Sequence, residues 1–275
     1  MIETKKKKES KVNGKYHYDT WSMFWQQCPA EIDRRELFPF SILGTSAKDI
    51  SSRPHVLSPP LMESLREFLP YTISEDNFWM KFSLVRDGSS LDTLLQKVRG
   101  SKSTLIAIET SNGEVFGSFQ STLWKRNQGY FGNGQSFLWR MRQSRNTQCS
   151  SIIDQAHLES QVDVYPWIGR DNMIQYCSQD MIAVGGGGGG INNSGFREKS
   201  ELGDEYFGLV IDSNLMRGTS SPCGTFGSPS LCINSVDGFF EVINLEVWTF
   251  SSCRDEESAQ KMEQANLFLL NNTEF

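Results

Sequence analysis

The sequence predicts an α+β fold that is mainly β: an antiparallel two-sheet β-sandwich flanked by helices. Three observations lead to this prediction. Near Lys102 the apolar residues change from helical spacing to alternation, which is typical of half-buried strands. The strand-like runs are short and are separated by Gly, Asn and Ser, as in a sandwich rather than a parallel sheet. Among 275 residues, 18 Phe, 7 Trp and 7 Tyr can build a substantial core.

A first helix is expected within LSPPLMESLREFLP, residues 57–70. Ser58 can cap it, Pro59 suits its first turn and Pro70 ends it. An apolar face at helical spacing makes this helix amphipathic, so it should cover one side of a larger body. That face is formed by Leu61, Leu65, Phe68 and Leu69.

A second amphipathic helix is expected within RDGSSLDTLLQKVRG, residues 86–100. Ser89 and Asp92 have the spacing of a capping box, in which each side chain bonds a free backbone N–H of the first turn. Gly100 stands where a helix would end. We expect this helix to pack at the side of the sandwich.

Five short runs predict strands. Asn112 and Gly113 supply a turn that joins the first two runs as an antiparallel hairpin. The last run is apolar on both faces, as expected of a strand that is covered twice. Residues 254–270, charged at first and then apolar, predict a C-terminal helix. The strand runs are TLIAIE (104–109), EVFGSFQ (114–120), SFLWRMR (136–142), YFGLVID (206–212) and FFEVINLEVWTF (239–250).

One domain is expected, with an extension at each end. Residues 1–54 are predicted to form an N-terminal tail followed by an aromatic docking segment, and residues 254–275 a C-terminal helix and tail. Between them, residues 55–253 form the domain, although residues 143–180 carry no clear period. The aromatic side chains of the docking segment should pack on the sandwich, since exposing them would leave an adhesive patch. They are Tyr16, Tyr18, Trp21, Phe24 and Trp25.

Charge and hydropathy narrow the class of protein. The net charge is −6, with 27 basic and 33 acidic side chains, which argues against a nucleic-acid partner. No run approaches 18 apolar residues, so no transmembrane segment is predicted. The opening residues MIETKKKKES show no apolar signal segment, so we expect a cytoplasmic protein. The Lys5–Lys8 run leaves open a nuclear address or contact with acidic lipid, beside a solvated terminus.

The cysteines and histidines predict neither a metal site nor a disulfide framework. Zinc sites usually take their ligands in close pairs, and none of the six cysteines forms a Cys-x-x-Cys pair. Only three histidines are present. We therefore expect no metal and reduced thiols.

Six successive glycines, Gly185 to Gly190, raise the question of phosphate binding. A Walker loop needs a Lys and a hydroxyl residue directly after its last glycine, and here Ile191 and Asn192 follow. A dinucleotide site needs a helix straight after the glycines, whereas this run leads into a polar loop and a strand. The run is therefore interpreted as a structural loop, and no cofactor is predicted.

Two residues invite a catalytic interpretation. Cys223 lies in GTSSPCGTFG, residues 218–227, which lacks the G-x-S-x-G nucleophile elbow. It is either a small apolar residue in a turn or a redox-active thiol. Glu246 interrupts an apolar strand, where a charge is costly unless it is paired, so a buried structural pairing is expected ahead of catalysis. No catalytic residue is predicted.

Several motifs in this order resemble a TLDc domain, the module of oxidation-resistance proteins and of some TBC-domain regulators. The resemblance covers about residues 55–253 and implies a two-sheet antiparallel sandwich flanked by helices. It rests on RDGSSLDTLL, LIAIETSNGEVFGSF, GYFGNGQSFLWRM, IAVGGGGGG, YFGLVIDSNLMRGTSSPCGTFG and FEVINLEVWTF. It implies functional or structural importance for nine motif positions: Gly117, Gly134, Gln135, Gly208, Asp212, Gly218, Cys223, Glu246 and Trp248.

One departure from the family pattern concerns Gln135, which stands where the family usually has Glu. No catalytic mechanism is agreed for TLDc domains. Members protect cells against oxidative damage, and several bind the vacuolar proton-pumping ATPase and regulate its assembly. The resemblance thus implies a non-enzymatic, cytosolic interaction module whose partner is the cytosolic sector of that pump. The alternatives are a redox or hydrolytic enzyme that uses Cys223, and a sandwich that binds a glycan or another small ligand.

Overall fold

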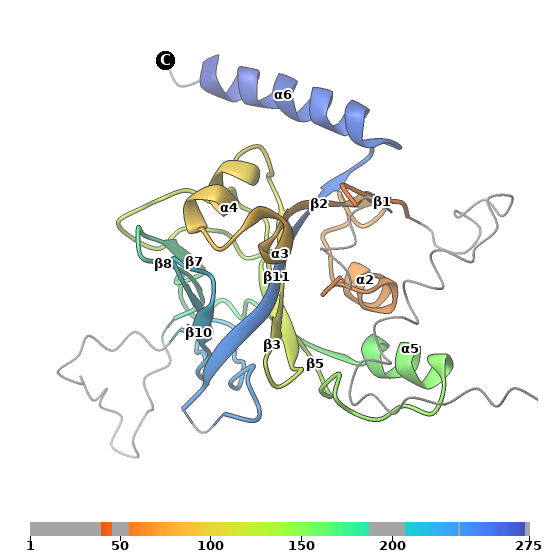
Figure 1. Ribbon diagram of the computed structural model, residues 1–275. Helices are drawn as coiled ribbons and strands as arrows, with labels where there is room; N and C mark the ends of the chain where they lie inside the picture. Colours follow the sequence, from red (N-terminus) through yellow and green to blue (C-terminus); the bar gives the residue numbers. More distant parts are fainter. Residues whose placement is uncertain (1–39, 46–54, 187–206, 236, 273–275) are drawn as a thin grey trace, which may run out of the picture.

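The computed structural model describes residues 40–45, 55–186, 207–235 and 237–272 (Figure 1). The predicted aromatic docking residues, from Tyr16 to Trp25, lie outside the described residues. Five helices are described: α2 (Pro59–Arg66), α3 (Leu84–Asp87), α4 (Leu91–Lys97), α5 (Ile152–Ser160) and α6 (Glu256–Asn272). The described strands are β1 (Ile42–Leu43), β2 (Asn77–Ser83), β3 (Thr104–Thr110), β4 (Val115–Gln120), β5 (Phe137–Met141), β6 (Val162–Pro166), β7 (Gln175–Cys177), β8 (Met181–Val184), β9 (Leu209–Asp212), β10 (Arg217–Thr219) and β11 (Phe239–Ser251).

The strands form a mostly antiparallel, open sheet, which confirms the prediction of a mainly β, α+β fold. Hydrogen bonding follows one path, β6-β5-β4-β3-β11-β10-β9-β8-β7, and every pair on it is antiparallel. β2 pairs with β11 off this path, and β1 pairs with β2 in parallel. Because the pairing is continuous, it does not by itself divide the strands into two sheets.

The 13-residue strand β11 lies in the middle of this path, between β3 and β10, and joins its two halves (Figure 1). Its first residues pair with β10, from Phe239 to Glu241. The remainder lies between β3 and β2, and the register against β3 shifts between Val242 and Asn244. A register shift of this kind bends a strand and increases its twist. β11 can therefore pair with β10 at its start and with β3 and β2 further along.

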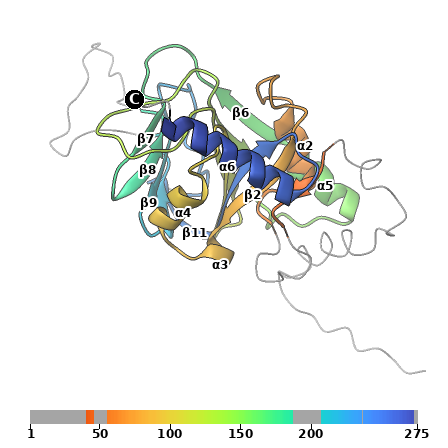
Figure 2. The same cartoon turned by 90° about the horizontal axis from the view of Figure 1, so that it is seen from above.

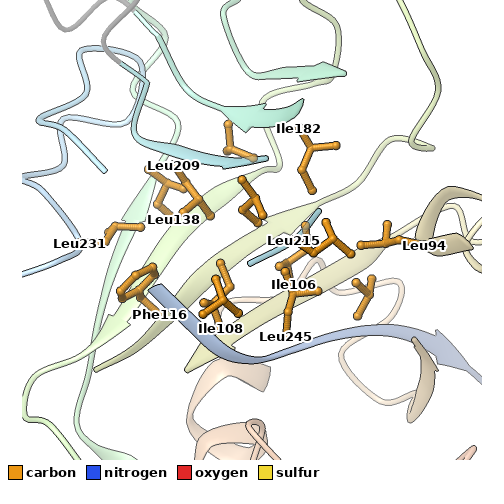
Figure 3. Packing of buried hydrophobic residues seen from close by; sticks show 14 of the residues in the cluster. Leu94, Ile106, Ile108, Phe116, Leu138, Ile182, Leu209, Leu215, Leu231 and Leu245 are labelled. Carbon is orange, nitrogen blue, oxygen red and sulfur yellow. The ribbon is translucent and has the colours of Figure 1, made fainter. Parts of the chain in front are cut away.

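Two large apolar clusters fill the two faces around β11. The first draws side chains from β3, β4 and β5 and also from β8 and β9, so strands from both ends of the path share it (Figure 3). The second lies beneath α2 and α5, where Leu61, Leu65 and Leu158 meet Phe78 and Trp139 of the sheet. Burial on both faces explains why most residues of β3 and β4 are apolar or small, with Glu109 and Gln120 near the strand ends as the exceptions.

The two predicted helices are present with different ends. Ser58 is the N-cap of α2, as predicted, but its side chain makes no capping hydrogen bond. α2 ends at Arg66 instead of reaching Pro70, and Phe68 is therefore 48% exposed and not part of the apolar face. The cap of α4 is Ser90, whose side chain accepts from the N–H of Thr93, and not Ser89 as predicted.

The stretch from 143 to 180 contains α5, β6 and β7, none of which the pattern predicted. β2, with the sequence NFWMKFS, was also not predicted, because bulky apolar residues lie on both of its faces and hide the alternation. The predicted C-terminal helix is present as α6, which lies across the top of the molecule (Figure 2). Ala259 of α6 packs against Leu43 and Trp79.

Gly117 of β4 occupies a position that admits no side chain. A Cβ atom there would overlap the carbonyl oxygen of Ile106 on β3 and would lie 3.2 Å from the Trp139 ring on β5. Because β4 is hydrogen-bonded to both strands, neither neighbour can move away without breaking the sheet.

We expect Gly117→Ala to lower the free energy of unfolding by about 3 kcal/mol or more, because the added methyl overpacks the interior of the sheet. Gly129→Ala is the matched control: nothing lies within 4 Å of a Cβ atom at that position. It should change stability by less than about 0.5 kcal/mol. Urea unfolding monitored by tryptophan fluorescence measures both. Equal stabilities for the two variants would contradict this account of the close approach.

Candidate functional site

The nine motif positions fall into three neighbourhoods. Gly117, Glu246 and Trp248 lie on β4 and β11, inside the sheet. Asp212 and Gly218 lie on β9 and β10, which pair with each other. The remaining four lie on loops: Cys223 contacts Gly185 and Gly208, whereas Gly134 and Gln135 precede β5 and are linked to the glycine run through Trp167 and Asp171. The structure therefore does not gather the nine positions into one site.

Glu246 is fully buried and is paired as the sequence analysis expected. Its Oε2 accepts hydrogen bonds from the N–H of Leu57, at 3.1 Å, and from the indole N–H of Trp248, at 3.0 Å. Its Oε1 lies 3.2 Å from Nδ1 of His55, whose side chain is 18% exposed. Each carboxylate oxygen thus has a partner, and Glu246 ties the segment before α2 to the central strand.

A second buried polar group, around Arg145, was missed by the sequence analysis. Its Nη1 lies 3.1 Å from Glu109 of β3, and its Nη2 lies 3.2 Å from Glu159 of α5. Nη2 also donates to the carbonyl of Val56 at 2.6 Å. All three charged residues are at most 5% exposed. Since Arg145 falls within the stretch that carried no clear period, no periodic signal marked it as buried.

The start of the glycine run is held in place by residues from distant parts of the chain. Gly185 has a φ of 74°, and a Cβ atom there would overlap the sulfur of Cys223. The hydroxyl of Thr225 accepts from the N–H of Gly186 at 3.0 Å and donates to Asp171 at 2.8 Å. Only glycine combines this backbone conformation with this close contact. The first two glycines of the run are therefore structural.

Cys223 is a poor candidate for a reactive thiol. It is 3% exposed, and its thiol donates to the carbonyl of Gly186 at 3.4 Å. Burial raises the pKa of the Cys223 thiol above its ordinary value, and the nearby Asp171 raises that pKa further. A reactive cysteine needs the opposite, because the thiolate is the nucleophile.

Two other buried thiols are also held protonated. Burial, followed by the hydrogen bond to Glu114, raises the pKa of Cys232 to about 12. Burial raises the pKa of Cys177 to about 11. Within the described parts of the chain the free cysteines are Cys149, Cys177, Cys223, Cys232 and Cys253.

Gln135, the departure from the family pattern, is exposed. Its backbone N–H donates to Oδ1 of Asn133 at 3.0 Å. The preceding Gly134 packs directly against the ring of Trp167, and the indole N–H of Trp167 donates to the carbonyl of Asp171 at 2.7 Å. The Gln135 side chain therefore stands on a rigid part of the surface, connected through Asp171 to the glycine loop.

Three aromatic rings, those of Tyr130, Tyr176 and Phe207, lie beside one another near Gly186. The ring centroids of Tyr130, Tyr176 and Phe207 lie 5.7, 6.2 and 6.3 Å from one another, and all three residues are half-buried. A Cβ atom on Gly186 would lie 2.9 Å from the Tyr130 hydroxyl, which places the rings beside the glycine loop. Such rings present an apolar body with a polar edge, the composition typical of protein-binding surfaces.

Asp212 acts on the backbone of the turn between β9 and β10. Its Oδ1 accepts from the N–H of Met216 at 3.1 Å and from the N–H of Arg217 at 3.4 Å. Within this turn, Leu215 has a φ of 57°, a conformation that costs energy for a leucine. The Asp212 carboxylate stabilises the turn, which is a sufficient reason for its presence.

The described residues offer little support for a ligand pocket at the motif positions or for a metal site. A surface pocket of about 260 Å³ lies between Glu114, Met141, Arg142 and Ile233, and none of the nine motif positions lines it. Among the described residues, no group of three or more His, Cys, Asp or Glu side chains is arranged to hold a metal ion. In the same part of the chain, every helix is too short or too polar to cross a bilayer.

We expect Arg145→Met to lower the free energy of unfolding by about 3–5 kcal/mol, because it leaves Glu109 and Glu159 buried without their cation. Arg142→Met is the control, since the side chain of Arg142 is 58% exposed. It should change stability by no more than about 0.5 kcal/mol. Chemical denaturation of both variants measures the difference. A loss for Arg145→Met no larger than that for Arg142→Met would show that the buried group contributes nothing.

Comparison with known proteins gives consistent matches. The chain is 28% identical over 258 residues to oxidation resistance protein 1 of Podospora anserina, a match that covers 83% of this chain and 69% of that protein. It is 26% identical over 217 residues to the protein of the same name from Yarrowia lipolytica, covering 76% and 79%. The human protein of that name is 27% identical over 203 residues, which are 74% of this chain but 19% of the human protein.

The family comparison covers most of the chain. The TLDc domain matches residues 50–251, a range that includes every strand from β2 to β11 and all nine motif positions. The chain therefore belongs to the TLDc domain family.

Proposed function

We propose that this protein is a non-enzymatic TLDc interaction module that protects against oxidative stress by binding the cytosolic sector of the vacuolar proton-pumping ATPase. The observation that carries the proposal is the TLDc match over residues 50–251. The relatives that share this domain are called oxidation resistance proteins, which supports a role in oxidative stress. The cytoplasm is the compartment in which such a contact would occur.

The chemistry around Cys223 supports contact over catalysis. Direct destruction of peroxide by a thiol requires an accessible thiolate, whereas this thiol is buried and its pKa is raised. The thiol donates to the carbonyl of Gly186, and the N–H of Gly186 donates to the Thr225 hydroxyl, as expected of a packed loop. Protection through a partner protein needs no such thiol.

The surface beside the glycine loop is the part that we propose to face the partner. It presents the half-buried rings of Tyr130, Tyr176 and Phe207 and the exposed side chain of Gln135. Gly134 and Gly185 anchor the loops beneath it, so the surface is preorganised. We also propose that the strands at the two ends of the sheet pack face to face as a sandwich, since both contribute to one core cluster.

Cys223→Ser is expected to leave the consumption of hydrogen peroxide by the purified protein unchanged, because a buried, protonated thiol reacts slowly. Cys253→Ser, at a half-buried thiol, is the control. Peroxide is followed with a colorimetric assay on proteins of equal melting temperature. Substantial turnover that disappears only in Cys223→Ser would identify a redox enzyme and overturn the proposed mechanism.

Gln135→Ala is expected to change the affinity for the purified cytosolic sector of the pump by about fivefold or more, the effect of altering about 1 kcal/mol at an interface. Gln143→Ala is the matched control, because Gln143 is also an exposed glutamine and follows β5, at the end of that strand opposite to Gln135. Binding is measured by biolayer interferometry with folded variants.

Gln135→Glu, which restores the residue usual in the family, tests whether the affinity for the pump rises or falls when a carboxylate stands at this position. Asp212→Ala belongs in the same series only if it melts normally, because Asp212 stabilises the turn after β9. Absence of binding by the parent protein at micromolar concentrations would show that the pump is not its partner.

A further inference from the structure

An exposed aromatic surface lies where α2 ends. Tyr71 is 91% exposed and Phe68 is 48% exposed, and only Leu69 and Pro70 lie between them in the turn after the helix. Two exposed aromatic side chains so close together are unusual on a surface with no partner. We define this surface, Phe68 and Tyr71 with the acidic residues around them, as the α2 surface.

The α2 surface carries negative charge. Glu63 and Glu67, one helical turn apart, are both exposed, and Glu75 follows in the next turn with its side chain 84% exposed. Arg66, which is mostly buried, lies 2.9 Å from Glu75. Within the described parts of the chain, Glu63 and Glu67 form no ion pair, so the surface favours a partner that is basic and aromatic.

The described chain begins beside this surface. Phe40 packs on Phe78, with ring centroids 5.0 Å apart, and the Arg66 guanidinium lies 5.6 Å from the centre of the Phe40 ring. Arg66 also donates to the carbonyl of Ser74, in the turn that follows Tyr71. Phe40, the first residue that the structure describes, thus lies next to the α2 surface.

The sequence of residues 1–39 has the required chemistry. Residues 1–15 hold six lysines and two glutamates, a net charge of +4, whereas the whole chain has a net charge of −6. The aromatic residues from Tyr16 to Trp25 follow directly. Fifteen residue steps lie between Trp25 and Phe40, and an extended chain of that length reaches up to about 50 Å, against about 12 Å for the length of α2.

We propose that the α2 surface binds residues 5–25 of the same chain: the aromatic residues contact Phe68 and Tyr71, and the lysines lie near Glu63, Glu67 and Glu75. Attachment at Phe40 raises the effective concentration of this segment at the surface to the millimolar range. A second copy of the chain or a different protein would not have this advantage. The pairing is therefore intramolecular.

Photo-crosslinking in the full-length chain tests the proposal. A photoreactive benzoylphenylalanine is placed at Tyr71 and, as a control, at Phe239, which is 46% exposed. Phe239 begins β11, whereas Phe250 near the other end of that strand contacts Phe78, the ring on which Phe40 packs. We expect crosslinks within one chain from position 71 to residues 5–25, and none to that segment from position 239.

Two results would overturn the proposal. Crosslinks from position 71 that join two chains would assign the surface to a second copy. If position 71 crosslinks to residues 5–25 no more strongly than position 239 does, the segment does not bind there. Charge reversal of Lys5–Lys8 to glutamate should weaken the crosslink from position 71, and an unchanged yield would contradict the charge pairing.

Limited trypsin cleavage after Lys15 gives a second measurement that needs no photoreactive residue. Phe68→Ser with Tyr71→Ser should speed this cleavage by about tenfold, which corresponds to ~1.4 kcal/mol of lost binding. Phe239→Ser should leave the rate unchanged. Since Phe68 and Tyr71 are surface residues, the double variant keeps the fold, which its melting temperature verifies. Equal cleavage rates for parent and double variant would reject the contact.

Discussion

The fold depends on β11, the strand in the middle of the pairing path that connects its two halves. Its first residues pair with β10, and the rest pairs with β3 and β2, so it contributes to both core clusters. The register shift between Val242 and Asn244 lets one strand make this change. β11 is the strand through which β2 and β3 on one side are connected to β10 on the other, so its loss would separate the two halves of the domain.

Buried polar groups then fix the segment before α2 to the sheet. Glu246 of β11 accepts from the N–H of Leu57, and Arg145 donates to the carbonyl of Val56. Because both contacts bind backbone groups, they specify the path of the chain and not only its burial. An apolar residue at either position would pack but would leave these backbone groups without partners. The position of α2, and of the α2 surface, follows from these contacts.

The first two glycines of the run, Gly185 and Gly186, serve the fold although the motif has the appearance of a phosphate loop. Gly185 and Gly186 lie against Cys223, Thr225 and Tyr130, so side chains are excluded by close contact with the protein itself. A phosphate loop instead leaves its backbone N–H groups free for a ligand. Here the N–H of Gly186 already binds Thr225. The buried sulfur of Cys223 contacts Gly185 and is therefore part of the packing of this loop.

The sequence by itself determined the mainly β class, the strands with clear periodicity, the helices near Ser58 and Ser90, and the TLDc family. It also indicated that Glu246 would be paired, since a lone charge in an apolar strand is too costly. Only the tertiary structure decided which groups pair with Glu246 and Arg145, where β2 and α5 lie, and that α2 ends early enough to expose Phe68. The physical reason is distance along the chain. Local patterns record propensity and burial. The partner of Glu246 lies 189 residues away at Leu57, and no local signal specifies a contact of that range.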